Sequence, residues 1–153
     1  MQDRASTILL LEDNIAISKL LCIVLRRQGY TVLAASNGDD AVRIGQRYQN
    51  ALDLVLSDVV LRNELAAPVV AKLRELSPGA GVIFLSGSNL ELLFERGYLE
   101  PGMMSNGRTL FLQKPFPPEV LIQTVGTVLH PEGGANEADR ECAEVNYIVR
   151  HAY

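Results

Sequence analysis

Four apolar segments of this sequence each end at a side chain that can bind a cation, bind an anion or transfer a proton. In chain order these residues are Glu12 with Asp13, then Asp58, Ser86 and Lys114. If the segments are parallel strands of one open sheet, their carboxyl ends meet at one edge, where ligands bind in such sheets. We therefore expect three carboxylates, one hydroxyl and one amine to converge on a single site.

Three converging carboxylates repel one another, and one of them must hold a proton unless a cation lies among them. Oxygen ligands without nearby His or Cys favour a hard ion, Mg²⁺ or Mn²⁺. We expect Glu12, Asp13 and Asp58 to supply carboxylate oxygens to such an ion. Val60 follows Asp58 by two positions, and its backbone carbonyl is a further candidate ligand.

A carboxylate can also act as a nucleophile and form an acyl phosphate. In that chemistry Asp58 is the nucleophile, while the metal ion and Lys114 neutralise the approaching anions. Ser86 can donate a hydrogen bond to a phosphoryl oxygen. Taken singly, each residue has a simpler structural explanation, such as a helix cap or a solvated lysine before a turn. Only their joint placement at strand ends indicates a phosphoryl-transfer site.

Short apolar runs alternate with amphipathic segments, and this alternation predicts the elements that position the site. Strands are expected at residues 7–11, 30–35, 52–57, 81–85 and 110–113. Helices are expected at residues 15–28, 39–48, 66–76, 90–98 and 118–129, and a loop at 99–108. Strict alternation of this kind implies a parallel sheet with helices on both faces. Asn14 should cap the first helix, Gly29 should end it, and Gly45 should weaken the second.

Composition narrows the class of protein. Apolar residues make up 48% of the 153 residues, so a real core can form. The net charge of −4, without a basic cluster, argues against direct binding of nucleic acid. No apolar run is long enough for a membrane span, and the N-terminus lacks a signal-peptide pattern. Cys22 and Cys142 have no metal-like spacing, and we expect a cytoplasmic location.

The chain divides at a Pro-Gly-rich break after the last predicted helix. Residues 1–130 are expected to form one domain, and residues 131–153 a C-terminal tail. Residues 136–153 carry a weak helical pattern. The tail could pack on the domain, mediate self-association or remain loose.

Four stretches resemble the receiver domain of two-component signalling. They are ILLLEDN, DLVLSDVVL, VIFLSGS and FLQKPF, which stand at residues 8–14, 53–61, 82–88 and 111–116. The resemblance covers about residues 6–129. The FLQKPF stretch is similar to receivers at the end of hybrid sensor kinases and to free-standing receivers. The fold implied is flavodoxin-like, an α/β doubly wound (βα)5 parallel sheet with strand order 2-1-3-4-5.

The resemblance also implies roles for the site residues. Asp58 would be the phosphoacceptor, with the Glu12-Asp13 pair binding Mg²⁺. Ser86 would be a switch hydroxyl, and Phe111 the aromatic switch that rotates inward when Ser86 moves. Lys114 would be the family's lysine, followed by a cis peptide bond to the next proline.

The function implied is that of a receiver that takes a phosphoryl group from a sensor histidine kinase or phosphotransfer protein. Such a domain catalyses its own phosphorylation and dephosphorylation but acts mainly in signalling. A homodimer through the face of residues 90–98, 110–113 and 118–129 is a further expectation. The stretch 61–64 lacks the proline usual after the phosphoacceptor, and Ala66 stands near a usual glycine. These departures keep open a second reading, a protein-binding module of the same fold that takes no phosphate.

Overall fold

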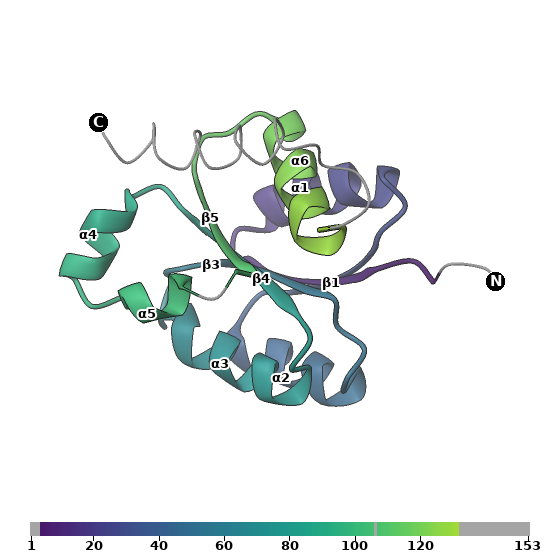
Figure 1. Ribbon diagram of the computed structural model, residues 1–153, viewed down its shortest axis with the longest axis horizontal. Helices are drawn as coiled ribbons and strands as arrows, with labels where there is room; N and C mark the ends of the chain where they lie inside the picture. Colours follow the sequence, from purple (N-terminus) through teal and green to yellow (C-terminus); the bar gives the residue numbers. More distant parts are fainter. Residues whose placement is uncertain (1–3, 106, 132–153) are drawn as a thin grey trace.

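A five-stranded parallel sheet forms the centre of the chain in the computed structural model, of which residues 4–105 and 107–131 are described (Figure 1). The sheet order is β2-β1-β3-β4-β5. The strands are β1 Thr7–Leu11, β2 Thr31–Ala35, β3 Leu54–Asp58, β4 Gly81–Ser86 and β5 Thr109–Gln113. The predicted flavodoxin-like fold with strand order 2-1-3-4-5 is therefore confirmed.

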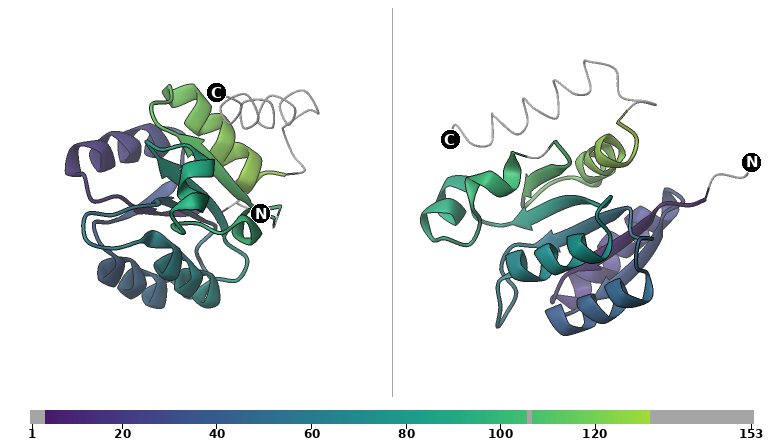
Figure 2. Two further views of the ribbon diagram at one scale, coloured as in Figure 1. Left: turned by 90° about the vertical axis from the view of Figure 1, so that its left-hand side faces the viewer. Right: turned by 60° about the horizontal axis from the view of Figure 1, so that its bottom comes forward.

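Helices cover both faces of the sheet (Figures 1 and 2). They are α1 Ile15–Arg27, α2 Gly38–Arg47, α3 Ala66–Leu76, α4 Leu90–Glu95, α5 Pro101–Met104 and α6 Pro118–Leu129. The helices α1 and α6 lie on one face, and α2 and α3 lie on the other. Among the described residues, no helix is long and apolar enough to cross a membrane.

Alternate residues of each strand enter two separate cores. Leu9, Val55 and Phe84 pack beneath α2 and α3. Leu10 and Leu56 belong to the core on the opposite face, together with residues of α1 and α6. Because both faces are covered, the strands need no polar alternation, which explains why they read as continuous apolar runs.

The ends of the first helix follow the sequence signals. The Asn14 side chain accepts a hydrogen bond of 3.1 Å from the Ile17 N–H and caps α1. Gly29 follows the helix with a φ of 91°, a conformation that costs glycine little. Both predictions for this helix are therefore confirmed.

The segment after β4 differs from the prediction. The expected helix 90–98 ends at Glu95, because Gly97 takes a φ of 71° and its N–H bonds back to Phe94 O. The expected loop 99–108 contains the single helical turn α5. Pro101 fits the first position of that turn, where no N–H is needed. Met103 and Met104 pack against the core, which holds the turn in place.

The C-terminal tail lies almost wholly outside the described residues. The last helix ends at Leu129, as predicted, with His130 as its C-cap. Beyond it only Pro131 is described. The expectations for the tail and for Cys142 concern residues 132–153 and stay predictions.

Two helical glycines provide a matched test of how tightly the helices pack. A Cβ added at Gly45 would lie 2.6 Å from Leu73 Cδ2, a buried side chain of α3. A Cβ at Gly126 in α6 would meet nothing within 4 Å. We expect Gly126→Ala to raise the free energy of unfolding by about 0.5–1 kcal/mol, because alanine favours the helix. We expect Gly45→Ala to lower it by about 1 kcal/mol, because overpacking outweighs that gain.

Urea denaturation of both variants measures these changes. If the two substitutions stabilised the protein equally, α2 and α3 would have moved to accommodate the added methyl group at position 45.

Candidate functional site

The carboxyl ends of four strands bring the predicted residues to one edge of the sheet. Asp58 and Ser86 are the last residues of β3 and β4. Glu12 follows β1, and Lys114 follows β5. The parallel register pairs Asp58 with Leu85 and Ser86 with Gln113, so the strand ends lie beside one another.

Glu12, Asp13 and Asp58 form an acidic cluster. Each offers a carboxylate oxygen, and these oxygens lie within 4.8 Å of one another. Glu12 is 2% exposed and Asp58 7%, so solvent screens their charges poorly. This donor set, all oxygen and compact, fits a hard divalent cation.

Lys114 is the cation that faces this cluster within the described chain. Its Nζ lies 2.7 Å from Asp58 Oδ1 and 3.3 Å from Glu12 Oε2. The contact with Asp58 Oδ1 is an ion pair without hydrogen-bond geometry, and no described donor gives that buried oxygen a hydrogen bond. Asp58 Oδ1 therefore keeps capacity to bind a further positive charge.

Burial and the neighbouring Glu12 carboxylate raise the pKa of Asp58 from 3.8 to about 7, although the Lys114 ammonium opposes them. Burial acts to lower the pKa of Lys114, but the Asp58 and Glu12 carboxylates outweigh it and raise that pKa. When only Lys114 balances the charge, the Asp58 carboxyl therefore holds its proton more tightly than an ordinary aspartate does. A bound divalent cation would favour the ionised form of Asp58 instead.

Two carboxylates hold the loop after Asp58 and the start of α2 in place through backbone hydrogen bonds. The Arg62 N–H donates to Asp13 Oδ2 at 2.6 Å. The Gly38 N–H, at the start of α2, donates to Glu64 Oε1 at 2.5 Å. A Cβ at position 38 would lie 2.7 Å from the Glu64 carboxylate, so a larger residue there would displace this side chain. The sequence alone did not indicate these two anchors.

The Val60 carbonyl is positioned by this loop. Val60 pairs with Leu65 in a single antiparallel bridge. The bonds around that bridge run from the Leu61 N–H to Glu64 O and from the Ala66 N–H to Val59 O. Among the described residues, none donates a hydrogen bond to the Val60 carbonyl. It is therefore available as a ligand.

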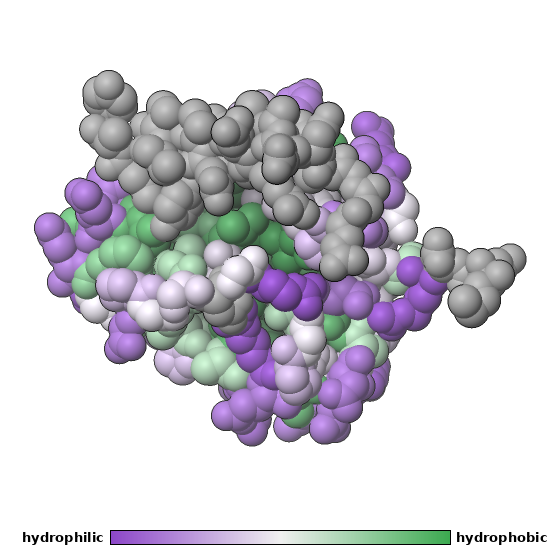
Figure 3. Space-filling view, in the orientation of Figure 1, coloured by the Kyte–Doolittle hydropathy of each residue, from purple (hydrophilic) through white to green (hydrophobic). Residues whose placement is uncertain are grey.

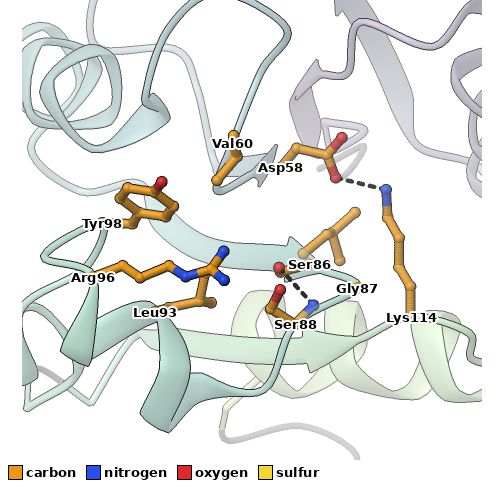
Figure 4. A pocket seen from close by; sticks show the side chains of 10 residues that line it. Asp58, Val60, Ser86, Gly87, Ser88, Leu93, Arg96, Tyr98 and Lys114 are labelled. Atoms are coloured by element: carbon orange, nitrogen blue, oxygen red, sulfur yellow. Dashed lines mark hydrogen bonds and ion pairs between the residues drawn. The ribbon is translucent and has the colours of Figure 1, made fainter.

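A pocket of about 330 Å³ opens beside Asp58 (Figure 4). Asp58, Ser86 and Lys114 line it together with Arg96 and Tyr98. The sequence did not indicate Arg96 and Tyr98, because they lie just after α4 and not at the end of a strand. Figure 4 shows the Arg96 guanidinium reaching in from the side opposite Lys114.

Ser86 is already engaged with the turn that follows β4. Its Oγ accepts a hydrogen bond of 3.0 Å from the Ser88 N–H. The hydroxyl hydrogen remains able to donate, so this bond is compatible with the predicted contact to a phosphoryl oxygen. The Lys114 N–H bonds to Ser86 O at 2.8 Å, which fixes the two residues relative to each other. The Lys114–Pro115 peptide bond is cis, as predicted.

Phe111 lies in the core of the domain. It is 5% exposed and packs with Leu90, Leu93 and Leu99. A phenylalanine ring has no polar atom to hold it at the surface, and burial stabilises it by about 1.5–3 kcal/mol. The ring is therefore turned inward in this structure, and its rotation on activation stays a prediction.

Asp58→Asn tests the raised pKa in metal-free protein. An acid whose folded pKa exceeds its unfolded value stabilises the fold below the unfolded pKa, and this stability is lost as pH rises through the folded pKa. For Asp58 the loss runs from about pH 4 to about pH 7. Asparagine does not titrate, so the variant should gain stability relative to wild type as pH rises.

Urea denaturation in EDTA at about pH 5 and about pH 8 measures this difference. Identical pH dependence of the two proteins would contradict the raised pKa.

Comparison with known proteins agrees with this geometry. A family model, the response regulator receiver domain, matches residues 8–126. The sensor kinase CckA of Brucella abortus is 31% identical over 128 residues, which are 84% of this chain and 13% of the kinase. The uncharacterized transcriptional regulatory protein YbdJ of Bacillus subtilis is 39% identical over 82 residues, 54% of this chain and 35% of YbdJ. The chain therefore spans only a minor part of these relatives.

Solved structures of related proteins have a similar fold. The receiver domain of hybrid histidine kinase CckA superposes with a TM-score of 0.67 at 27% identity, covering 82% of this chain and all of that one. The chemotaxis protein CheY4 of Vibrio cholerae gives 0.69 at 25% identity, with the same coverage. With the matched fold and the acidic edge of the sheet, this chain belongs to the response regulator receiver domain family of two-component signalling.

Proposed function

We propose that this receiver accepts a phosphoryl group on Asp58 from a phosphohistidine of a sensor kinase or phosphotransfer protein, in a reaction that requires Mg²⁺ or Mn²⁺. One observation carries the proposal. A buried carboxylate at the end of β3 lies between two further carboxylates and a lysine, and a pocket opens beside it.

The residues present fit a divalent ion. Glu12, Asp13 and Asp58 would hold it through carboxylate oxygens, with the Val60 carbonyl as a fourth ligand. When bound, the ion would offset the charge of the carboxylates and of the phosphoryl oxygens. The Arg62 N–H donates a hydrogen bond to Asp13 Oδ2, which helps to hold this carboxylate in place beside the cluster.

The transfer itself makes and breaks one bond. An Asp58 carboxylate oxygen attacks the phosphorus, a new O–P bond forms, and the N–P bond to the donor imidazole breaks. The electron pair of that bond returns to the imidazole nitrogen, which takes a proton from solvent. The product is an acyl phosphate on Asp58.

The neighbouring residues assist by position and charge. Lys114 lies 2.7 Å from Asp58 Oδ1 and can follow the negative charge onto the phosphoryl oxygens. The Ser86 hydroxyl lines the same pocket and can donate to one of them. No described side chain in the pocket is a carboxylate or histidine, apart from Asp58 itself. The pocket thus offers no general base to activate water against the acyl phosphate.

Exposed apolar side chains near the site provide a surface for the donor protein. Ile15, Leu20 and Ile23 of α1 are half or more exposed, and Val60 beside Asp58 is 46% exposed. Single exposed apolar residues are common on protein surfaces. In this set, however, Ile15 and Val60 each follow a residue of the acidic cluster by two positions. We infer that the donor protein covers this surface when it presents its phosphohistidine. Dimerisation through α4, β5 and α6 stays a prediction.

Added Mg²⁺ should stabilise the protein. At ten times the dissociation constant, binding to the folded state alone raises the free energy of unfolding by about 1.4 kcal/mol. Asp13→Asn should weaken this effect, because it removes a carboxylate ligand. Asp39→Asn, an exposed carboxylate on α2, is the matched control and should respond like wild type. Thermal unfolding with and without Mg²⁺ measures the effect.

Incubation with acetyl phosphate and Mg²⁺ tests the transfer directly. Intact mass should increase by one phosphoryl group in wild type and in Asp39→Asn. Asp58→Asn should show no increase, and Lys114→Met should react at least tenfold more slowly, because it loses the cation next to the attacking oxygen.

A wild-type protein that binds Mg²⁺ but gains no mass, even with a phosphorylated kinase as donor, would refute the phosphoacceptor role. That result, or failure to bind Mg²⁺, would favour the alternative of a phosphate-independent binding module.

A further inference from the structure

Arg96 is a second cation at the phosphoacceptor pocket, and the proposed phosphoryl transfer does not use it. It is the C-cap residue of α4, and its side chain lines the pocket with Asp58, Ser86 and Lys114. In Figure 4 the guanidinium reaches toward the middle of the pocket from the side opposite Lys114. Two cationic side chains thus approach the same space from two different elements.

The two cations differ in how they are neutralised. Lys114 lies within ion-pair distance of both Asp58 and Glu12. Within residues 4–105 and 107–131, the Arg96 side chain forms no ion pair or hydrogen bond. The Arg96 guanidinium therefore lies at the pocket without an acidic partner in the described chain.

The net charge of the site indicates which anion Arg96 would bind. Three ionised carboxylates, Lys114 and one divalent ion sum to zero. Conversion of the Asp58 carboxylate into an acyl phosphate replaces one negative charge with up to two. The site then lacks one positive charge, and Arg96 is the cation in the pocket that can supply it. Guanidinium groups bind phosphoryl oxygens in a bidentate way.

The place of Arg96 in the fold gives this contact a consequence. Leu90 and Leu93 anchor α4 in the core, while Arg96 itself is exposed at the end of the helix. Gly97 follows with a φ of 71°, so the chain turns directly after Arg96. A bond from Arg96 to a group on Asp58 would link the end of α4 to the end of β3.

We infer that Arg96 binds the phosphoryl group on Asp58 and so couples phosphorylation to the position of α4. This inference rests on the proposed function. It makes Arg96 a second phosphate-binding cation, which acts only when the phosphoryl group is present. Its loss should therefore leave Mg²⁺ binding and folding unchanged.

The test compares Arg96→Gln with Arg47→Gln, an exposed arginine at the end of α2, remote from the pocket. Affinity for beryllofluoride, a phosphoryl mimic, is measured by calorimetry in saturating Mg²⁺. We expect Arg96→Gln to bind it about tenfold more weakly or worse, and Arg47→Gln to match wild type. Arg96→Lys should recover part of the affinity, because it restores the charge without the fork.

Amide NMR shifts of Leu93 and Gly97 report on α4. Beryllofluoride should shift them in wild type, and the shifts should shrink in Arg96→Gln. Equal beryllofluoride affinity in wild type and Arg96→Gln would overturn the role of Arg96 while leaving Asp58 as phosphoacceptor. If wild type itself does not bind beryllofluoride with Mg²⁺, the proposed function fails first. Loss of Mg²⁺ affinity in Arg96→Gln would instead indicate a structural role and also overturn the inference.

Discussion

The repulsion among Glu12, Asp13 and Asp58 is the constraint around which this site is organised. Their oxygens lie within 4.8 Å of one another, and two of the three residues are almost fully buried. Lys114 offsets only part of this charge, so the cluster retains a proton or requires a cation. A site that is unfavourable when empty and fully charged is well suited to bind a divalent ion and then a phosphoryl group.

The fold supports this arrangement because the sheet is covered on both faces. The strands fill both cores mainly with apolar side chains, and the buried charged residues Glu12 and Asp58 lie at the carboxyl edge of the sheet. Hydrogen bonds that involve the Asp13 and Glu64 carboxylates tie the loop after Asp58 to the neighbouring elements. The same loop leaves the Val60 carbonyl available. Departure from the family pattern in this loop therefore does not disturb the acidic cluster.

Two side chains near α4 differ in their surroundings. Phe111 is buried in the core, whereas Arg96 lines the pocket and is exposed at the end of the helix. Within the described residues, Arg96 forms no ion pair or hydrogen bond. In the role inferred for Arg96, electrostatic attraction would carry a signal from Asp58 to α4.

The sequence determined the strands, the helices at 66–76 and 118–129, and the five residues that meet at the edge of the sheet. Those features depend on local periodicity and on the rule that parallel strands end together. The tertiary structure decided the rest. Arg96 lies at the pocket because α4 ends at Glu95 and the chain turns at Gly97, and two methionines of the helical turn α5 pack against the core. Glu64 anchors the loop through a hydrogen bond from the backbone N–H of Gly38, which lies 26 positions earlier in the chain. Contacts between residues far apart in the chain leave no periodic signal, since they arise only when separate elements pack together.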